Sequence, residues 1–390
     1  MFFNRSQNQS GRIRVLVNGI HAKSGGGVTY IRNLLPLLAK DNSIELHLFL
    51  HSEQLALFRS IDEDVKIHSL NFPNGFFSTL LWEQFILPIH AKLMLVDVTF
   101  SPANFGPLFA PRTIIVLRNS LAVAGDETRL IKRLYWLCLT WMTKLSLIKC
   151  ERAIAVSNYA KKVLTDGMGS RLRHKVPVIY HGVNNAFQPS LNRKRERFLL
   201  SVSDIYIQKN IHTLISAFHL VRNKFPEVTL KLAGKAIDQS YLREIQATIY
   251  SAKLNDAVEI LGEKSTAELI ELYQSCALFV FPSTVETFGN PLVEAMACGT
   301  PIVSSNKAAM PEILADAAKY FNPTDAKDMA ETIVSVMEND EERQKLSALA
   351  LRRSKYFSWE KTATETASIF KSIVPPKSIN TDKKDQSHAN

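Results

Sequence analysis

Apolar residues along this chain fall into two series of short runs, separated by stretches in which they recur at helical spacing. The runs that predict buried strands in the first half are 12–18, 44–50, 96–102, 112–117 and 152–157. Those of the second half are 198–203, 228–234, 257–262, 277–282 and 301–305. Strands that alternate with helices usually pair in parallel. The pattern therefore predicts an α/β fold with one parallel sheet in each half.

One polar segment divides the two series. Residues 181–197, "HGVNNAFQPSLNRKRER", are basic and rich in turn formers, so they predict a linker. An N-terminal domain over 12–180 and a C-terminal domain over 198–355 are expected on either side of it. The polar ends, 1–11 and 374–390, are expected to be disordered. Ligands of open α/β sheets bind at the carboxyl ends of strands, so the cleft between the domains is the expected site.

The composition is that of an ordinary globular protein. The 390 residues are 46% hydrophobic and 22% charged, which allows a large core without disulfides or metal. The four cysteines show no CxxC pairing, which is typical of a reducing compartment. The N-terminal stretch lacks the apolar core of a signal peptide, and no run of about eighteen apolar residues predicts a membrane span. A cytoplasmic protein is therefore expected.

The net charge suggests the kind of partner. Lysine and arginine exceed aspartate and glutamate by ten, 47 against 37, which favours phosphorylated small molecules, nucleic acid or an anionic membrane face. No zinc finger or RNP segment is present, so nucleic acid is not expected. The stretch 129–149 mixes aromatic and aliphatic residues with basic ones, and 76–95 is similar. Both predict either docking on an anionic bilayer or core helices with a solvated basic edge.

Two carboxylates stand out in the second half. The segment "STVETFGNPLVEAMACG" at 283–299 carries Glu286 and Glu294, separated by seven residues. Asn290 is a favourable N-cap and Pro291 a favourable first helical residue, so a loop followed by a helix is expected. The free N–H groups at a helix N-terminus attract anions, phosphates above all.

Either glutamate alone has an ordinary explanation. Glu286 can be a solvated loop residue, and Glu294 can be held near the N-terminus by the helix dipole. Apolar segments flank this helix, however, so it is expected to be buried. A buried carboxylate needs a partner, and a ligand hydroxyl is one candidate.

Further candidates also have plain alternatives. In the loop "SGGGV" at 24–28, Gly26 and Gly27 could bring backbone N–H groups close to a phosphate, and a flexible turn is the alternative. Tyr30 stands where the last glycine of a dinucleotide fingerprint would be, so a dinucleotide site is weakly supported. Lys209 lies between a strand and a helix, where it could neutralise a diphosphate or be an exposed loop lysine.

Three other features favour structural explanations. His181, at the hinge between the domains, is expected to be a turn residue or a satisfied structural histidine. Residues 62–64, "DED", resemble an Asp-x-Asp metal site, but they lack supporting ligands, so a solvated turn is favoured and no catalytic metal is expected. Pro36 interrupts the helix after the glycine loop and predicts a kink.

The spacing of Glu286 and Glu294, with "AMACGTPIVS" after them, resembles the E-x7-E signature of retaining, GT-B-fold glycosyltransferases of family 4. The resemblance covers roughly residues 12–372. It includes "SGGGVTYIRNLL", "IAVSNYAKKVL", "QKNIHTLISAF" and a closing "FSWEKTA". It implies two Rossmann-like domains that face each other across a cleft, the first for an acceptor and the second for a donor. It also implies a C-terminal helix over 356–373 that packs back towards the first domain.

The resemblance implies roles for the matching residues. Glu294 would bind the ribose hydroxyls of a nucleotide sugar. Glu286 would hold hydroxyls of the donor sugar and help to stabilise the transition state. The glycine loop would border the donor diphosphate and the acceptor. Backbone N–H groups of one segment would surround the sugar and diphosphate: Phe288, Gly289, Asn290, Pro291 and Leu292.

Two positions depart from the family pattern. Asp204 stands where the family usually has an arginine, which leaves one phosphate-binding cation unaccounted for. Arg118 or a lysine elsewhere is a candidate to replace it. Many relatives carry a His-Asp pair after the fourth strand, whereas the segment here reads "VLRNSLAV". Arg118 and Asn119 are therefore expected to line the cleft.

The resulting expectation is a retaining hexosyltransferase that needs neither cofactor nor metal. Its donor would be a nucleotide diphosphate sugar, and its acceptor a hydroxyl of a saccharide or lipid-linked saccharide. Lys209 would stabilise the leaving diphosphate, which would take the acceptor proton. The expected context is assembly of a cell-envelope polysaccharide such as lipopolysaccharide, in the cytoplasm and peripherally on the inner face of the membrane.

Three rival functions remain. One is a nucleotide-sugar epimerase on the same architecture. Another is a non-catalytic nucleotide-sugar-binding partner, which the departures at Asp204 and Arg118 favour and the intact Glu286, Glu294 and Lys209 oppose. The third is a periplasmic sugar-binding protein, which the missing signal peptide disfavours.

Overall fold

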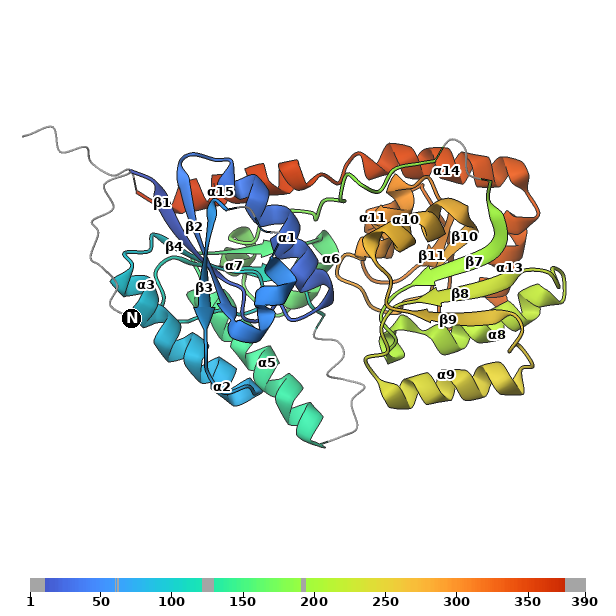
Figure 1. Ribbon diagram of the computed structural model, residues 1–390, viewed down its shortest axis with the longest axis horizontal. Coiled ribbons are helices and arrows are strands. Elements are labelled where there is room, and N and C mark those ends of the chain that lie inside the picture. The colour runs from blue at the N-terminus through green and yellow to red at the C-terminus, as the bar shows by residue number, and fades with distance from the viewer. Residues whose placement is uncertain (1–10, 60, 62, 121–129, 191–193, 376–390) are drawn as a thin grey trace, which may run out of the picture.

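The computed structural model describes residues 11–59, 61, 63–120, 130–190 and 194–375. These residues form two α/β lobes, and the C-terminal helices run along one side of both (Figure 1). Nearly all of the two ends expected to be disordered, 1–10 and 376–390, lies outside the described residues.

The first lobe holds a six-stranded parallel sheet in the order β3-β2-β1-β4-β5-β6. Its strands are β1 (Ile13–Asn18), β2 (Ile44–His51), β3 (Val65–Leu70), β4 (Val98–Ser101), β5 (Thr113–Leu117) and β6 (Arg152–Ala155). Its helical segments are α1 (Gly25–Ala39), η1 (Ser52–Phe58), α2 (Phe76–Leu81), η2 (Trp82–Ile86), α3 (Leu87–Leu93), α5 (Leu130–Lys149), α6 (Asn158–Leu164) and α7 (Ser170–His174).

The second lobe repeats this plan with the strand order β12-β11-β10-β7-β8-β9, again all parallel. Its strands are β7 (Glu196–Val202), β8 (Thr229–Ala233), β9 (Val258–Gly262), β10 (Cys276–Phe281), β11 (Ile302–Ser305) and β12 (Lys319–Phe321). Its helical segments are η3 (Ile207–Lys209), α8 (Ile211–Arg222), α9 (Gln239–Ser251), α10 (Thr266–Ser275), α11 (Asn290–Ala297), α12 (Met310–Leu314), α13 (Ala326–Met337) and α14 (Asp340–Ser354). The chain then returns to the first lobe through α15 (Trp359–Ile373).

Continuous apolar runs form the central strands of both sheets. Every residue of β5, "TIIVL", and of β10, "CALFVF", is buried. Helices cover both faces of a parallel sheet, so a central strand has no solvent side and needs no polar alternation. The predicted α/β fold with one parallel sheet in each half is confirmed.

The structure differs from the sequence-based prediction in several elements and boundaries. The strands β3 and β12 were not predicted, because β3 is half exposed and β12 has only three residues. Neither gives the continuous apolar run that marks a buried strand. β7 begins at Glu196, inside the predicted linker. α1 continues through Pro36 as one helix.

Contacts on the linker side hold the lobes together. α15 packs against α1, and Lys371 Nζ lies 2.6 Å from an Asp41 carboxylate oxygen. Glu312 of α12 accepts hydrogen bonds from the backbone N–H groups of Asn158, at 2.7 Å, and Tyr159, at 2.9 Å. These groups lie at the N-terminus of α6, where the helix dipole favours a carboxylate. The contacts orient the lobes around a shared cleft.

Candidate active site

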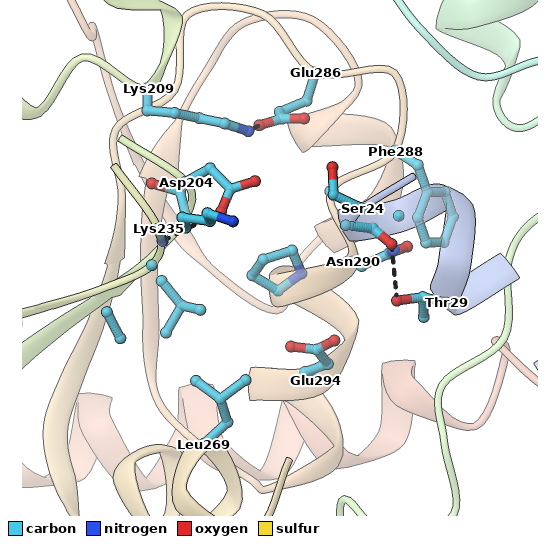
Figure 2. Close-up of a pocket in the computed structure, with 18 of the residues that line it drawn as sticks. Ser24, Thr29, Asp204, Lys209, Lys235, Leu269, Glu286, Phe288, Asn290 and Glu294 are labelled. Atoms are coloured by element: carbon cyan, nitrogen blue, oxygen red, sulfur yellow. Dashed lines mark hydrogen bonds and ion pairs between the residues drawn. The ribbon is translucent and has the colours of Figure 1, made fainter. Parts of the chain in front are cut away.

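A cleft of about 450 Å³ lies between the lobes, at the carboxyl ends of both sheets (Figure 2). Loops after β1 and β5 form one wall, and loops after β7, β8, β9 and β10 form the other. The expected residues that line it are Gly26, Arg118, Asn119, Lys209, Glu286, Phe288, Gly289, Asn290, Pro291 and Glu294. Gly27 and Leu292, which were also expected at the site, are buried behind the walls.

Helix α11 presents its N-terminus to the cleft. It begins at Asn290, and Gly289, not Asn290, is the N-cap, with a φ of 88° that favours glycine. The expected set of N–H groups is smaller than predicted: Pro291 has none, and that of Leu292 donates to the Gly289 carbonyl at 3.0 Å. The N–H groups of Phe288, Gly289 and Asn290 have no partner within the described part of the chain. They are therefore available to an anion.

Glu294 lies further along α11, with its carboxyl group enclosed at the cleft (Figure 2). The Tyr273 hydroxyl donates a hydrogen bond of 3.0 Å to its Oε2 atom. Burial raises the pKa of Glu294 to about 7, and the hydrogen bond from Tyr273 offsets only part of this rise. Its Oε1 atom has no hydrogen-bond partner among the described residues, so it can accept a ligand hydroxyl.

Glu286 and Lys209 form an ion pair in the wall of the cleft (Figure 2). Burial by itself would lower the pKa of the Lys209 ammonium, but the Glu286 carboxylate and Tyr206 raise it above its ordinary value. Lys209 is therefore charged at neutral pH and is not an exposed loop lysine. Its charge is already shared with Glu286 before any ligand is bound.

Asp204 lies at the end of β7, across from the glycine loop (Figure 2). Its Oδ1 atom accepts a hydrogen bond from the Lys235 backbone N–H at 3.3 Å. A Cβ atom added at Gly25 would lie 3.8 Å from its Oδ2 atom, so the two walls approach closely here. The position presents a carboxylate to the cleft where the family resemblance places an arginine.

Arg118 and Asn119 follow β5 and are held by Asn104. The Asn104 amide oxygen accepts from the N–H groups of Arg118, at 2.9 Å, and Asn119, at 3.0 Å. Arg118 Nη1 donates to the Gly26 carbonyl at 3.1 Å. A Cβ atom at Gly27 would lie 2.7 Å from Arg118 Nη2. Gly27 therefore leaves room for the guanidinium, and this explains why it does not line the cleft.

His181 is a structural residue, but it is not satisfied as expected. Its ring packs between Tyr30 and Trp359, with centroids 5.0 and 5.6 Å away, and its Nδ1 atom lies 3.0 Å from Asn290 Oδ1. Burial lowers the pKa of His181 to about 4, so the ring is neutral at pH 7. Its Nε2 atom is enclosed and has no hydrogen-bond partner among the described residues. The residue also lines the cleft, beside Asn290 of α11.

Candidate metal ligands do not gather within the described residues, where no three His, Cys, Asp or Glu side chains form a cluster that could hold an ion. Of the segment 62–64, Asp62 lies outside the described residues, and Glu63 and Asp64 are in a turn before β3 that does not line the cleft.

Some lining residues were not identified from the sequence. They include Thr29, Tyr206, Lys235, Glu263, Lys264 and Leu269. Most lie just after a strand of one of the two sheets, which is the only signal that could have found them. That signal does not say which side chains turn towards the cleft, because this depends on the loop conformation.

Known proteins resemble the chain in sequence over part of its length. Residues 183–353 match the family "Glycosyl transferases group 1". The O-antigen chain mannosyltransferase B of Escherichia coli is 30% identical over 178 residues, which is 45% of each protein. The O-antigen chain mannosyltransferase RfbU of Salmonella typhimurium is 28% identical over 232 residues, 57% of this chain and 62% of that protein. The chain thus spans less than two thirds of either relative.

Solved structures resemble the chain over nearly all of its length. The crystal structure of Anabaena HepE in complex with UDP and glucose gives a TM-score of 0.74 at 18% identity, over 93% of this chain and 100% of that one. At this identity the likeness shows the fold, and it confirms the predicted architecture. The chain therefore has the GT-B fold, and its residues 183–353 match the glycosyl transferases group 1 family.

Proposed function

We propose that the protein transfers a sugar from a nucleotide diphosphate sugar to a hydroxyl group of an acceptor. The observation that carries this proposal is the N-terminus of α11, whose free N–H groups open into a cleft that also holds Glu286 and Glu294. The N-terminus suits the diphosphate. Glu294 suits the ribose hydroxyls, and Glu286 suits those of the transferred sugar. The family matched by residues 183–353 supports the same activity.

The proposed reaction retains the configuration of the anomeric carbon. The bond from this carbon to the diphosphate oxygen breaks, and the acceptor oxygen forms its bond on the same face. The acceptor proton passes to the departing diphosphate oxygen, so no protein nucleophile is required. Glu286 stabilises the positive charge that develops on the sugar, while Lys209 and the α11 N-terminus stabilise the leaving diphosphate. These groups take the role of a metal, and we propose that the reaction is metal-independent.

The relatives support a substrate class. Both curated relatives are by name O-antigen chain mannosyltransferases, and HepE was solved with UDP and glucose. We therefore propose a hexose donor, with mannose as the first candidate. The proposed acceptor is a saccharide or lipid-linked saccharide in the assembly of a cell-envelope polysaccharide such as lipopolysaccharide.

A nucleotide-sugar screen tests the proposal. A ligand at a hundred times its dissociation constant stabilises the folded protein by about 2.7 kcal/mol, which a thermal-shift assay with GDP-mannose, UDP-glucose and other nucleotide sugars detects. The donor that binds is then incubated with oligosaccharide acceptors in the presence and absence of EDTA. NMR of the product gives its anomeric configuration. The proposal is wrong if no nucleotide sugar binds and none is consumed.

The same experiment separates the alternatives. A nucleotide-sugar epimerase changes the donor without an acceptor. A non-catalytic binding partner is stabilised by the donor and consumes none of it under any condition. Neither outcome is expected if Lys209 and Glu286, which form an ion pair in the cleft, stabilise the transition state as proposed.

Two stripes of exposed apolar side chains lead to a further part of the proposal. On α2, η2 and α3 they recur every four residues: Phe77, Leu81, Phe85, Ile89 and Leu93. On α5 they recur every three or four residues: Leu134, Leu137, Trp141, Leu145 and Ile148. The rings of Phe76 and Tyr135, with centroids 4.8 Å apart, join the stripes. We call residues 76–95 and 133–149 the docking face. Exposed patches of this kind mark interaction sites.

The charge of the docking face favours an anionic bilayer. Its exposed charged side chains are all basic: Lys92, Arg133, Lys144 and Lys149. Its acidic residue, Glu83, is buried. Two copies of this face would repel each other, whereas acidic lipid headgroups attract it. We therefore propose that the first lobe lies peripherally on the inner face of the membrane.

None of the helices in the described ranges combines the length and the apolar character needed to cross a membrane.

A further inference from the structure

Arg118 carries a charge that no acidic side chain neutralises within the described part of the chain. Its Nη1 atom donates to the Gly26 carbonyl, and its Nε atom is enclosed without a hydrogen-bond partner from any described residue. The groups that influence its charge are its buried surroundings and Tyr30, not a carboxylate. Enclosing a cation without an anion is costly. A ligand that brings an anion to this position would offset that cost.

The surroundings of Arg118 nevertheless leave it charged. Burial lowers the pKa of Arg118 to about 10. This value is still well above 7, so the guanidinium is protonated at neutral pH. Burial also raises the pKa of the Tyr30 phenol above its ordinary value, so Tyr30 supplies no counter-charge. On the facing wall, the Lys209 ammonium is already paired with Glu286. Arg118 is therefore available to a ligand in a way that Lys209 is not.

Arg118 also lies beside the end of α11 that attracts phosphates. The Thr287 hydroxyl, just before this helix, donates a hydrogen bond to the Arg118 carbonyl. The Gly26 carbonyl accepts a hydrogen bond from the Arg118 guanidinium, and a Cβ atom at Gly26 would lie 3.6 Å from Asn290 Nδ2. A cation of the first lobe and the free N–H groups of the second lobe thus border one part of the cleft.

We infer that Arg118 binds the donor diphosphate from the wall opposite α11, in place of the arginine that is missing at Asp204. The inference rests on the proposed function and adds that the first lobe supplies a phosphate-binding cation. The planar donors of a guanidinium suit two phosphate oxygens at once. Asp204 cannot replace it, because its carboxylate repels a diphosphate. The donor diphosphate is then held between the two lobes.

Binding measurements on the full chain test the inference. The ligands are guanosine, GMP and GDP, and uridine, UMP and UDP, each titrated by calorimetry. Arg118→Gln is expected to weaken diphosphate binding by on the order of tenfold to a hundredfold, the range for a hydrogen bond to a charged group. Binding of the nucleoside is expected to remain unchanged. Arg118→Lys is expected to recover part of the loss, because it keeps the charge.

A matched control removes the same charge elsewhere. Arg152 lies at the amino end of β6, away from the cleft, and Arg152→Gln is expected to bind the diphosphate like the wild type. The inference is overturned if Arg118→Gln loses no diphosphate affinity, or loses the same factor for nucleoside and diphosphate. It is also overturned if diphosphate binding is kept while the KM for the acceptor rises, since the anion then belongs to the acceptor. A wild-type protein that binds neither diphosphate contradicts the proposed function as well.

The stability of the ligand-free protein separates a binding role from a structural one. Removal of an unpaired, enclosed charge is expected to keep or raise the melting temperature of Arg118→Gln without ligand. The rise that GDP or UDP causes in the wild type is expected to shrink in this variant. A large drop in the ligand-free melting temperature would mean that Arg118 holds the Gly26 loop in place, which contradicts the inference.

Discussion

Glu286 and Glu294 have the same side chain but different surroundings in the cleft. Glu286 is paired with the Lys209 ammonium, whereas the polar partner of Glu294 is the neutral Tyr273 hydroxyl. Burial raises the pKa of Glu294 to about 7. Carboxyl groups whose environments differ in this way are suited to different tasks. Glu294 is therefore the residue through which pH is expected to control nucleotide binding.

The affinity for a nucleotide sugar is expected to rise between about pH 6 and pH 8. Glu294 accepts ribose hydroxyls as a carboxylate, so protein that is protonated at this position must release a proton on binding. A nucleotide sugar has no secondary phosphate that titrates in this range, and the pKa of His181, about 4, keeps that ring neutral. Calorimetric titration at several pH values measures the effect.

Glu294→Gln provides the control for this pH dependence. The variant is expected to bind about tenfold or more weakly, since it loses a hydrogen bond to a charged group, and to show no change with pH. A rise of the wild-type size in Glu294→Gln would assign the pH dependence to another residue.

Lys209 is expected to contribute to turnover more than to donor affinity. Lys209→Ala removes the cation beside the leaving diphosphate and leaves the Glu286 carboxylate without its partner. Loss of a preorganised charge of this kind lowers kcat on the order of a hundredfold or more. Lys209→Arg is expected to retain part of the activity. Steady-state kinetics with the identified donor measure both variants, with Lys224→Ala, an exposed lysine of the same lobe, as the control. Near-normal turnover in Lys209→Ala would mean that the diphosphate binds elsewhere.

Among the elements, the strands β2 and β3 at the edge of the first sheet carry a cluster of titratable side chains. His47 Nδ1 lies 2.9 Å from His68 Nε2, and His47 Nε2 lies 3.2 Å from Glu45 Oε1. Burial lowers the pKa of His47 to about 4, although Glu45 opposes this shift, and burial also lowers the pKa of His68. The folded edge therefore contains neutral imidazoles at pH 7.

The free energy of unfolding is expected to fall as pH decreases from about 7 to about 5. The pKa of His47 is about 4 in the folded protein and 6.5 in the unfolded chain. As the pH falls, the unfolded chain therefore takes up a proton at a higher pH than the folded protein does. The contribution of His47 is present above pH 6.5 and is lost as pH falls towards 4. Between pH 7 and pH 5 the loss amounts to about 2 kcal/mol.

Urea titrations of His47→Gln at both pH values test this expectation. The variant is expected to lose less stability than the wild type on acidification. His219→Gln, which changes an exposed histidine of α8, is expected to behave like the wild type. Equal losses in His47→Gln and the wild type would show that other groups cause the acid sensitivity.

In the whole molecule, the first lobe carries both the docking face and one wall of the cleft. The helices α2, α3 and α5 lie along one side of this lobe, opposite the side that α15 covers (Figure 1). A bilayer bound to these helices leaves the second lobe, with α11 and Glu294, open to a donor from solution. The arrangement suits an acceptor that is presented by lipid.

Vesicle binding is expected to require anionic lipid and to weaken as salt is added, because screening reduces the attraction between headgroups and exposed lysines. Lys144→Glu combined with Lys149→Glu is expected to reduce binding to phosphatidylglycerol vesicles in a sedimentation assay. Lys224→Glu combined with Lys253→Glu changes the same charge on the second lobe and is the control. Binding that does not change with salt, or no binding at all, would contradict docking on an anionic bilayer.

Local sequence determined the elements that carry the site. The run 277–282 predicted β10, because a strand covered on both faces needs consecutive apolar residues. Pro291 marked the start of α11 to within one residue, because a residue without an N–H fits only the first turn of a helix. The spacing of Glu286 and Glu294 then placed one carboxylate before this helix and one within it. These are short-range properties, which explains why the fold and this side of the cleft could be predicted.

Only the tertiary structure decided which side chains meet. Lys209 and Glu286 are 77 positions apart and pair because η3 lies beside the loop after β10. His181 Nε2 and Arg118 Nε are enclosed without hydrogen-bond partners among the residues that the structure describes. Their enclosure likewise depends on residues from distant parts of the chain. Helical periodicity is the same whether an apolar stripe packs on a core or faces outward, so the exposure of the stripe through Trp141 was also undetermined. The sequence by itself set periodicity, helix ends and the chemical types available, whereas packing set partners and burial, and through them the charge states on which the proposed chemistry depends.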